Sequence, residues 1–262
     1  MSPMLSLDLT HLTAGLEVYG WTFLRLSGFL MIAPLFGATL VPGRIKLVFA
    51  LTLTMVLAPL APKLPLIEPL SATALVTAVQ QLLIGVALGF VVQVAFDALL
   101  LAGQVIANTM GLGFATMVDP SRGASTVVVG QFFLIFGMLL FLSVDGHLVL
   151  LGVLADSFKW MPPGPEGLTA PAFATIGAWG AKMFSAGAVI ALPAVVGLLL
   201  VNLALGVVSR AAPQLNLFAV GFPASMLLGF AMLLLSLPSL QGGFERLLLD
   251  AFGSAQHLIG GG

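Results

Sequence analysis

Long apolar stretches separated by loops rich in proline and glycine constrain this chain most strongly. Six candidate segments lie at about residues 16–35, 47–60, 72–108, 127–155, 173–208 and 215–237. A helix needs about 20 apolar residues to cross the hydrocarbon core of a bilayer, so hydropathy alone suggests six crossings. The second segment is nearer in length to a buried or re-entrant helix. We therefore predict an all-α, polytopic membrane protein.

The scarcity of charged side chains supports this prediction. Hydrophobic residues make up 60% of the chain and charged residues 7%, whereas about 25% of an ordinary globular protein is charged. The net charge of −1 provides no large basic field for binding nucleic acid. The start of the chain carries Asp8 and Glu17 instead of a basic region, so a cleaved secretory signal is not expected.

A stripe of small and polar residues runs along the third apolar segment. Gly85 and Gly89 are followed by four polar residues at spacings of four or seven, which places them on one helical face: Gln93, Asp97, Gln104 and Asn108. In a membrane helix such a face packs against another helix or lines a wet cavity. For Asp97 the alternatives are a structural hydrogen bond and a role in a channel or a partner contact.

The segment at residues 108–125 combines glycines, which permit tight backbone paths, with apolar side chains that water solvates poorly. One interpretation is a plug or gasket packed in a cavity, since long loops are often functional. The alternative is an ordinary connection with a few buried anchors. Further along the chain, Gly221, Ser225 and Gly229 are four residues apart and predict a face suited to close helix packing.

Enzymatic chemistry finds little support in the sequence. Ser143, Asp145 and His147 suggest a hydrolase, but side chains two apart on a helix point away from each other. The three histidines are far apart and no P-loop occurs, so neither a metal site nor nucleotide hydrolysis is expected. We predict no catalytic residue and no cofactor.

Two long motifs carry a resemblance to a known family. They are DPSRGASTVVVGQFFLIFGMLLFLSVDGHLVLLGVL at residues 119–154 and SRAAPQLNLFAVGFPASMLLGF at residues 209–230. APLFG at residues 33–37 and the P-x-R at residues 42–44 add to them. With six apolar segments and a matching length, the chain resembles the FliR family of type III export-gate proteins, which includes a flagellar and a virulence-injectisome branch.

The resemblance implies a gate formed with FliP and FliQ homologues, associated with FlhB, through which unfolded flagellar proteins leave the cytoplasm. It implies a place in the bacterial inner membrane, at the flagellar basal body, in a helical assembly that sits partly above the membrane plane. Residues 1–172 would form a FliP-like part, and residues 173–262 a FliQ-like helical hairpin with a C-terminal tail. Six crossings need not hold in such an assembly.

The resemblance also assigns residues. The plug of the closed lumen would comprise Gly111, Leu112, Gly113, Phe114, Ala115 and Met117, and the hairpin turn would contain Arg210, Pro213, Gln214 and Asn216. The face at Gly221, Ser225 and Gly229 would admit a FliQ neighbour. Two rivals remain: a six-helix small-solute transporter with a site near Asp97, and an intramembrane hydrolase that uses Asp145 or His147.

Overall fold

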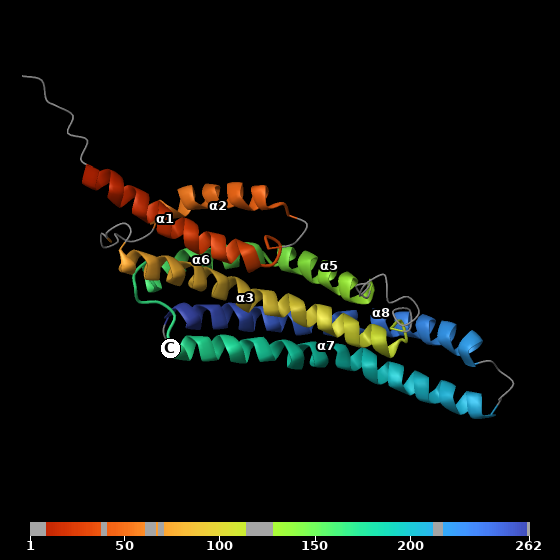
Figure 1. Ribbon diagram of the computed structural model, residues 1–262. Helices are drawn as coiled ribbons and strands as arrows, with labels where there is room; N and C mark the ends of the chain where they lie inside the picture. Colours follow the sequence, from red (N-terminus) through yellow and green to blue (C-terminus); the bar gives the residue numbers. More distant parts are fainter. Residues whose placement is uncertain are drawn as a thin grey trace, which may run out of the picture. The chain divides into compact units, whose positions relative to one another are not determined.

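The computed structural model of the protein describes residues 9–37, 41–60, 67, 71–113, 128–211 and 217–260 (Figure 1). Every regular element within these ranges is a helix. They are α1 (Leu9–Ile32), α2 (Gly43–Leu57), the short 3-10 helix η1 (Ala58–Leu60), α3 (Ala72–Thr109), α5 (Val128–Ser143), α6 (Gly146–Trp160), α7 (Ala170–Ala211) and α8 (Leu217–Gly260). The prediction of an all-α fold is confirmed.

The described residues contain fewer candidate membrane-spanning helices than the six that hydropathy alone suggests. Three helices are long and apolar enough to cross a membrane: α3, α7 and the Pro223–Gly260 part of α8. The number rises to four if α5 and α6, which are bent by 70° at their short break, form one span. Helix α2 has only 15 residues, fewer than the ~20 that a crossing requires, and the apolar character of α1 is diluted by Glu17 and Arg25.

The end of the chain differs from its prediction as well. The sixth apolar segment was expected to stop at about residue 237, but α8 continues to Gly260 through Pro223 and Pro238. This last part buries one face, with Phe244, Leu248 and Ala251 almost fully covered. Burial of apolar area stabilises a helix that sequence propensity alone does not predict.

The helices form two compact units, each assembled from separate stretches of chain. Unit 1 comprises Met1–Gln93, Gly146–Ala178 and Ala251–Gly262, and unit 2 comprises Val94–Asp145 and Trp179–Asp250. The predicted division between residues 172 and 173 rests on resemblance to two other gate subunits and stays a prediction.

In unit 1, α1 packs closely along the first part of α3. Glycines make this approach possible: a methyl group added at Gly85 would collide with the backbone carbonyl of Arg25, and one added at Gly28 would collide with that of Leu82. At Gly89 the added carbon would lie 2.9 Å from the carbonyl oxygen of Phe29. The glycines of the predicted stripe therefore serve contact between two helices of the same chain.

Arg25 is the polar centre of unit 1 and is 0% exposed. Its Nε donates to Gln81 Oε1 at 2.8 Å, and its two terminal nitrogens donate to Ser157 Oγ at 3.0 Å and to the Met161 carbonyl at 2.6 Å. The guanidinium also lies 4.3 Å from the ring centre of Phe158. Neutral acceptors on α3 and α6, and just beyond α6, thus solvate a buried cation that pairs with no carboxylate among the described residues.

In unit 2, the second part of α3 contacts α5, α7 and α8. Phe96 on α3 meets Phe141 on α5 and Phe244 on α8 edge to face, with ring centres 5.4 and 5.3 Å apart, a favoured geometry for aromatic pairs. Gly103 on α3 and Gly130 on α5 face each other so closely that a side chain at Gly103 would strike the backbone of α5.

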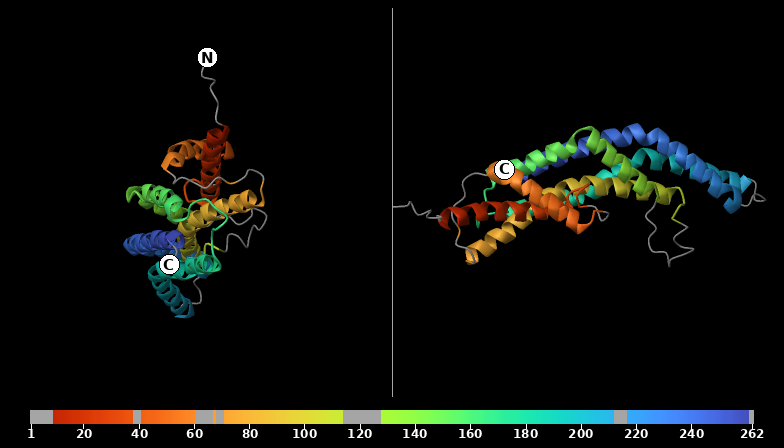
Figure 2. Two further views of the ribbon diagram at one scale, coloured as in Figure 1. Left: turned by 90° about the vertical axis from the view of Figure 1, so that its left-hand side faces the viewer. Right: turned by 90° about the horizontal axis from the view of Figure 1, so that it is seen from above.

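Within unit 2, α7 and α8 run side by side in opposite directions (Figures 1 and 2). Gly197 faces Met232, and further along Ile190 faces Gly243. The outer faces of both helices remain apolar and exposed. They include Leu192, Val196, Leu199, Leu200, Leu203, Leu227, Phe230, Leu234 and Leu235. Such continuous apolar surface requires lipid or other protein to cover it.

Candidate functional site

The candidate site begins where α3 ends. Gly111 adopts a φ of 83°, and its N–H donates to the Asn108 carbonyl at 3.0 Å, while the Leu112 N–H donates to the Ala107 carbonyl at 3.0 Å. These two bonds around a left-handed glycine form the Schellman motif that terminates helices. Gly111 therefore stops α3 and directs the chain into the predicted plug.

The structure places only part of that plug. Gly111, Leu112 and Gly113 form a turn at the end of α3, where all three are partly exposed. Phe114, Ala115 and Met117 lie outside the described residues. Closure of a lumen by this loop stays a prediction.

The base of the loop is tied to the α7–α8 pair. Asn202 on α7 donates from Nδ2 to the Thr109 carbonyl at 3.2 Å, and Ser225 on α8 donates to Asn202 Oδ1 at 3.2 Å. Met110, which is 0% exposed, packs on Gly229, where an added carbon would lie 2.7 Å from Met110 Cγ and Cε. We call these five residues the loop tether.

Asn202 lies inside the apolar segment at residues 173–208, and the sequence alone does not assign it a role. The available signal was the cost of burying an unpaired amide in an apolar environment, which predicts a polar partner without identifying it. Thr109 lies 93 positions away along the chain, and this separation has no local signature.

The small-residue face of α8 is partly occupied within the chain. Ser225 and Gly229 are buried, and Gly221 is partly exposed. The contacts of Ser225 with Asn202, and of Gly229 with Met110, show close packing of this face inside the chain. Access by a FliQ neighbour stays a prediction. Arg210 is exposed in the last turn of α7, whereas Pro213, Gln214 and Asn216 lie outside the described residues.

The polar stripe of α3 follows the boundary of its packed surface. Gln93, Asp97 and Gln104 are partly buried, and Asn108 is exposed near the turn. Gln93 and Asp97 both take part in polar or electrostatic interactions, in keeping with a carboxylate that is costly to leave alone in a membrane. A role for these side chains in lining a channel or contacting a partner stays a prediction.

The Ser143–His147 region forms a bend between two helices. Asp145 has a φ of 55°, is exposed, and lies in the break between the end of α5 and the start of α6. His147 Nδ1 is buried and has no hydrogen-bond partner among the residues that the structure describes. Nowhere in the described part of the chain do three His, Asp or Glu side chains gather as a possible metal site.

Comparison with known proteins adds a family. Residues 16–251 match the family described as "Bacterial export proteins, family 1". Similar proteins named flagellar biosynthetic protein FliR occur in Escherichia coli (strain K12), 38% identical over 244 residues and 93% of each chain, and in Pectobacterium carotovorum subsp. carotovorum, 36% identical over 249 residues and 95% of each chain. That of Aquifex aeolicus (strain VF5) is 35% identical over 239 residues, which cover 91% of this chain and 92% of the relative.

Proposed function

Because this chain belongs to the family of bacterial export proteins, family 1, and is a component of flagellar export, we propose that it forms part of the export channel together with FliP and FliQ homologues. The match over residues 16–251 carries this proposal. The flagellar names of the relatives favour the flagellar branch over the injectisome branch. In this function the chain is a structural and transport subunit without a catalytic residue.

The helix lengths support an assembled state. Helices α7 and α8 contain 42 and 44 residues, which at about 1.5 Å per residue corresponds to roughly 63–66 Å. A bilayer core is only about 30 Å thick. Helices of this length, with exposed apolar outer faces, are suited to packing against FliP and FliQ homologues in the inner membrane and beyond it. An FlhB homologue would complete the set of partners.

The loop at the end of α3 provides the proposed means of closure. Apolar side chains in this loop, Leu112, Phe114 and Met117, would fill the lumen of the resting gate and exclude ions. The loop tether would hold the base of the loop while the rest moves aside for an unfolded flagellar protein. This mechanism is a change of packing and requires no bond to be made or broken.

Deletion of residues 111–117 tests this mechanism. In membranes that contain the assembled gate, we expect the deletion to raise ion conductance well above that of the intact gate. A second variant, with Leu112, Phe114 and Met117 all replaced by Ser, keeps the loop length and should also leak. Co-purification with the FliP homologue first verifies assembly of each variant. Conductance at the intact level in both assembled variants would exclude the plug role.

A further inference from the structure

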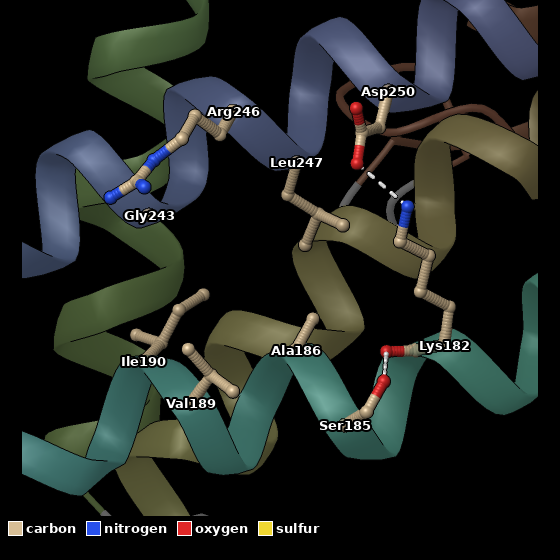
Figure 3. A pocket seen from close by; sticks show the side chains of 9 residues that line it. All are labelled: Lys182, Ser185, Ala186, Val189, Ile190, Gly243, Arg246, Leu247 and Asp250. Atoms are coloured by element: carbon tan, nitrogen blue, oxygen red, sulfur yellow. Dashed lines mark hydrogen bonds and ion pairs between the residues drawn. The ribbon is translucent and has the colours of Figure 1, made fainter.

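An open groove of about 310 Å³ lies between α7 and α8 in unit 2. Figure 3 shows Val189 and Ile190 of α7 pointing toward α8, and Leu247 of α8 pointing toward α7. These side chains form its apolar walls. The complete lining consists of Lys182, Ser185, Ala186, Val189, Ile190, Gly243, Arg246, Leu247 and Asp250.

The charges of the groove do not cancel. Lys182 Nζ lies 2.6 Å from Asp250 Oδ2, so these two side chains neutralise each other. Arg246 donates only to the Gly242 carbonyl of its own helix, at 2.9 Å, and pairs with no carboxylate among the described residues. Glu245, the neighbouring acid, accepts a hydrogen bond from Gln241 and does not line the groove. One positive charge therefore remains beside an apolar cleft.

The groove lies at one end of a long uncharged stretch. No charged residue occurs between Lys182 and Arg210 on α7, and none occurs on α8 before Glu245. The separation of 28 residues (210 − 182) corresponds to about 42 Å of helix. A bilayer that includes its headgroup regions is about 40–45 Å thick. If this stretch crosses the membrane, Lys182 and Arg210 lie at opposite headgroup layers, and the groove opens at one of them.

We propose that this groove binds one anionic phospholipid. The Arg246 guanidinium would donate two parallel hydrogen bonds to the phosphate, the geometry that arginine and phosphate favour. The start of an acyl chain would lie along Val189, Ile190 and Leu247. Basic pockets between membrane helices are suited to such headgroups. The proposal requires only that α7 and α8 lie in a membrane, so it is independent of the plug.

Thermal unfolding of the full chain, isolated from bacterial membranes in a neutral detergent, tests the proposal. Phosphatidylglycerol at about 100 times its dissociation constant should raise Tm by about 5 °C. Zwitterionic phosphatidylcholine should produce a much smaller shift. Arg246→Gln should lose most of the response to phosphatidylglycerol. Lys159→Gln is the matched control, because Lys159 is an exposed cation on α6, paired with Asp156, and should keep the response.

Several results would overturn the lipid assignment. A Tm shift with phosphatidylcholine as large as that with phosphatidylglycerol would show that the headgroup charge is not recognised. A Tm shift of the same size with inorganic phosphate would show that the site binds any anion and not a lipid. A full response in Arg246→Gln would exclude the assigned contact. In the membrane-isolated assembly, efficient disulfide cross-linking of Ser185→Cys to a cysteine on a neighbouring subunit would assign the groove to protein.

Discussion

At the residue scale, the buried guanidinium of Arg25 should be a major determinant of the stability of unit 1. Arg25→Met removes hydrogen bonds to the buried Gln81 and Ser157 and to the partly buried Met161 carbonyl, and leaves these acceptors without their donor. Hydrogen bonds to charged groups contribute about 1.5–3 kcal/mol each. We expect the free energy of unfolding in detergent to fall by about 3 kcal/mol or more.

Arg44→Met is the control for this experiment, because Arg44 is exposed near the start of α2. It should change the unfolding free energy by less than about 0.5 kcal/mol. Equal destabilisation by the two substitutions would show that loss of any cation is harmful and would contradict the role assigned to the Arg25 contacts.

A second prediction at this scale concerns stability and follows from the close packing of α1 against α3. Gly85→Ala places a methyl group against the backbone carbonyl of Arg25, which cannot rotate away. The helices must separate, so we expect a lower Tm and a loss of at least about 2 kcal/mol, in the range of overpacked sites. Gly152→Ala on α6, where no described residue outside the local turn of the helix lies within 4 Å of the added carbon, should be neutral or slightly stabilising. Comparable Tm values for the two variants would refute the close packing.

The sequence indicated which residues are unusual for an apolar segment. It did not indicate which residues they contact. The glycines and the charge at residue 25 stand out in apolar segments, and membrane physics predicts that such residues are packed or paired. Their partners, such as Ser157 for Arg25 and Asp250 for Lys182, lie 132 and 68 positions away. Contacts at this separation depend on tertiary packing, which one sequence does not reveal.

At the element scale, the loop tether fixes the end of α3. Asn202→Ala removes the donor to the Thr109 carbonyl and the acceptor for Ser225. Because the amide is exposed, we expect a loss of only about 1 kcal/mol. The effect should be local: amide hydrogen exchange at residues 110–112 should become several-fold faster. Ser209→Ala removes a hydroxyl that donates to the Gly206 carbonyl of its own helix, so it should leave this exchange unchanged. Exchange equal to wild type in Asn202→Ala would argue against the tether.

Helix boundaries were predictable where a backbone signal marks them. Glycine after a helical pattern is a common stop, and Gly111 ends α3 in this way. Hydropathy did not divide the apolar segment at residues 127–155, whereas the structure breaks it before Gly146, where Asp145 adopts a left-handed conformation that non-glycine residues rarely take. The extension of α8 through Pro238 to Gly260 was also missed, since proline normally argues against a continuing helix.

At the scale of the whole molecule, the composition was sufficient to predict the class of fold. The two long motifs were sufficient to predict the family. A chain with 7% charged residues cannot cover itself with a water-soluble surface. The number of crossings was not predictable, because hydropathy does not distinguish apolar surface that faces lipid from apolar surface that faces protein. The exposed rows on α7 and α8 are consistent with either environment.

The central claim is that these helices are stable in contact with sister subunits around a shared channel. The most direct test is to isolate the tagged full chain from bacterial membranes in mild detergent and measure the mass and composition of what co-purifies. We expect a discrete complex that contains the FliP and FliQ homologues together with this chain. A well-folded monomer that binds neither homologue when both are supplied would contradict the account.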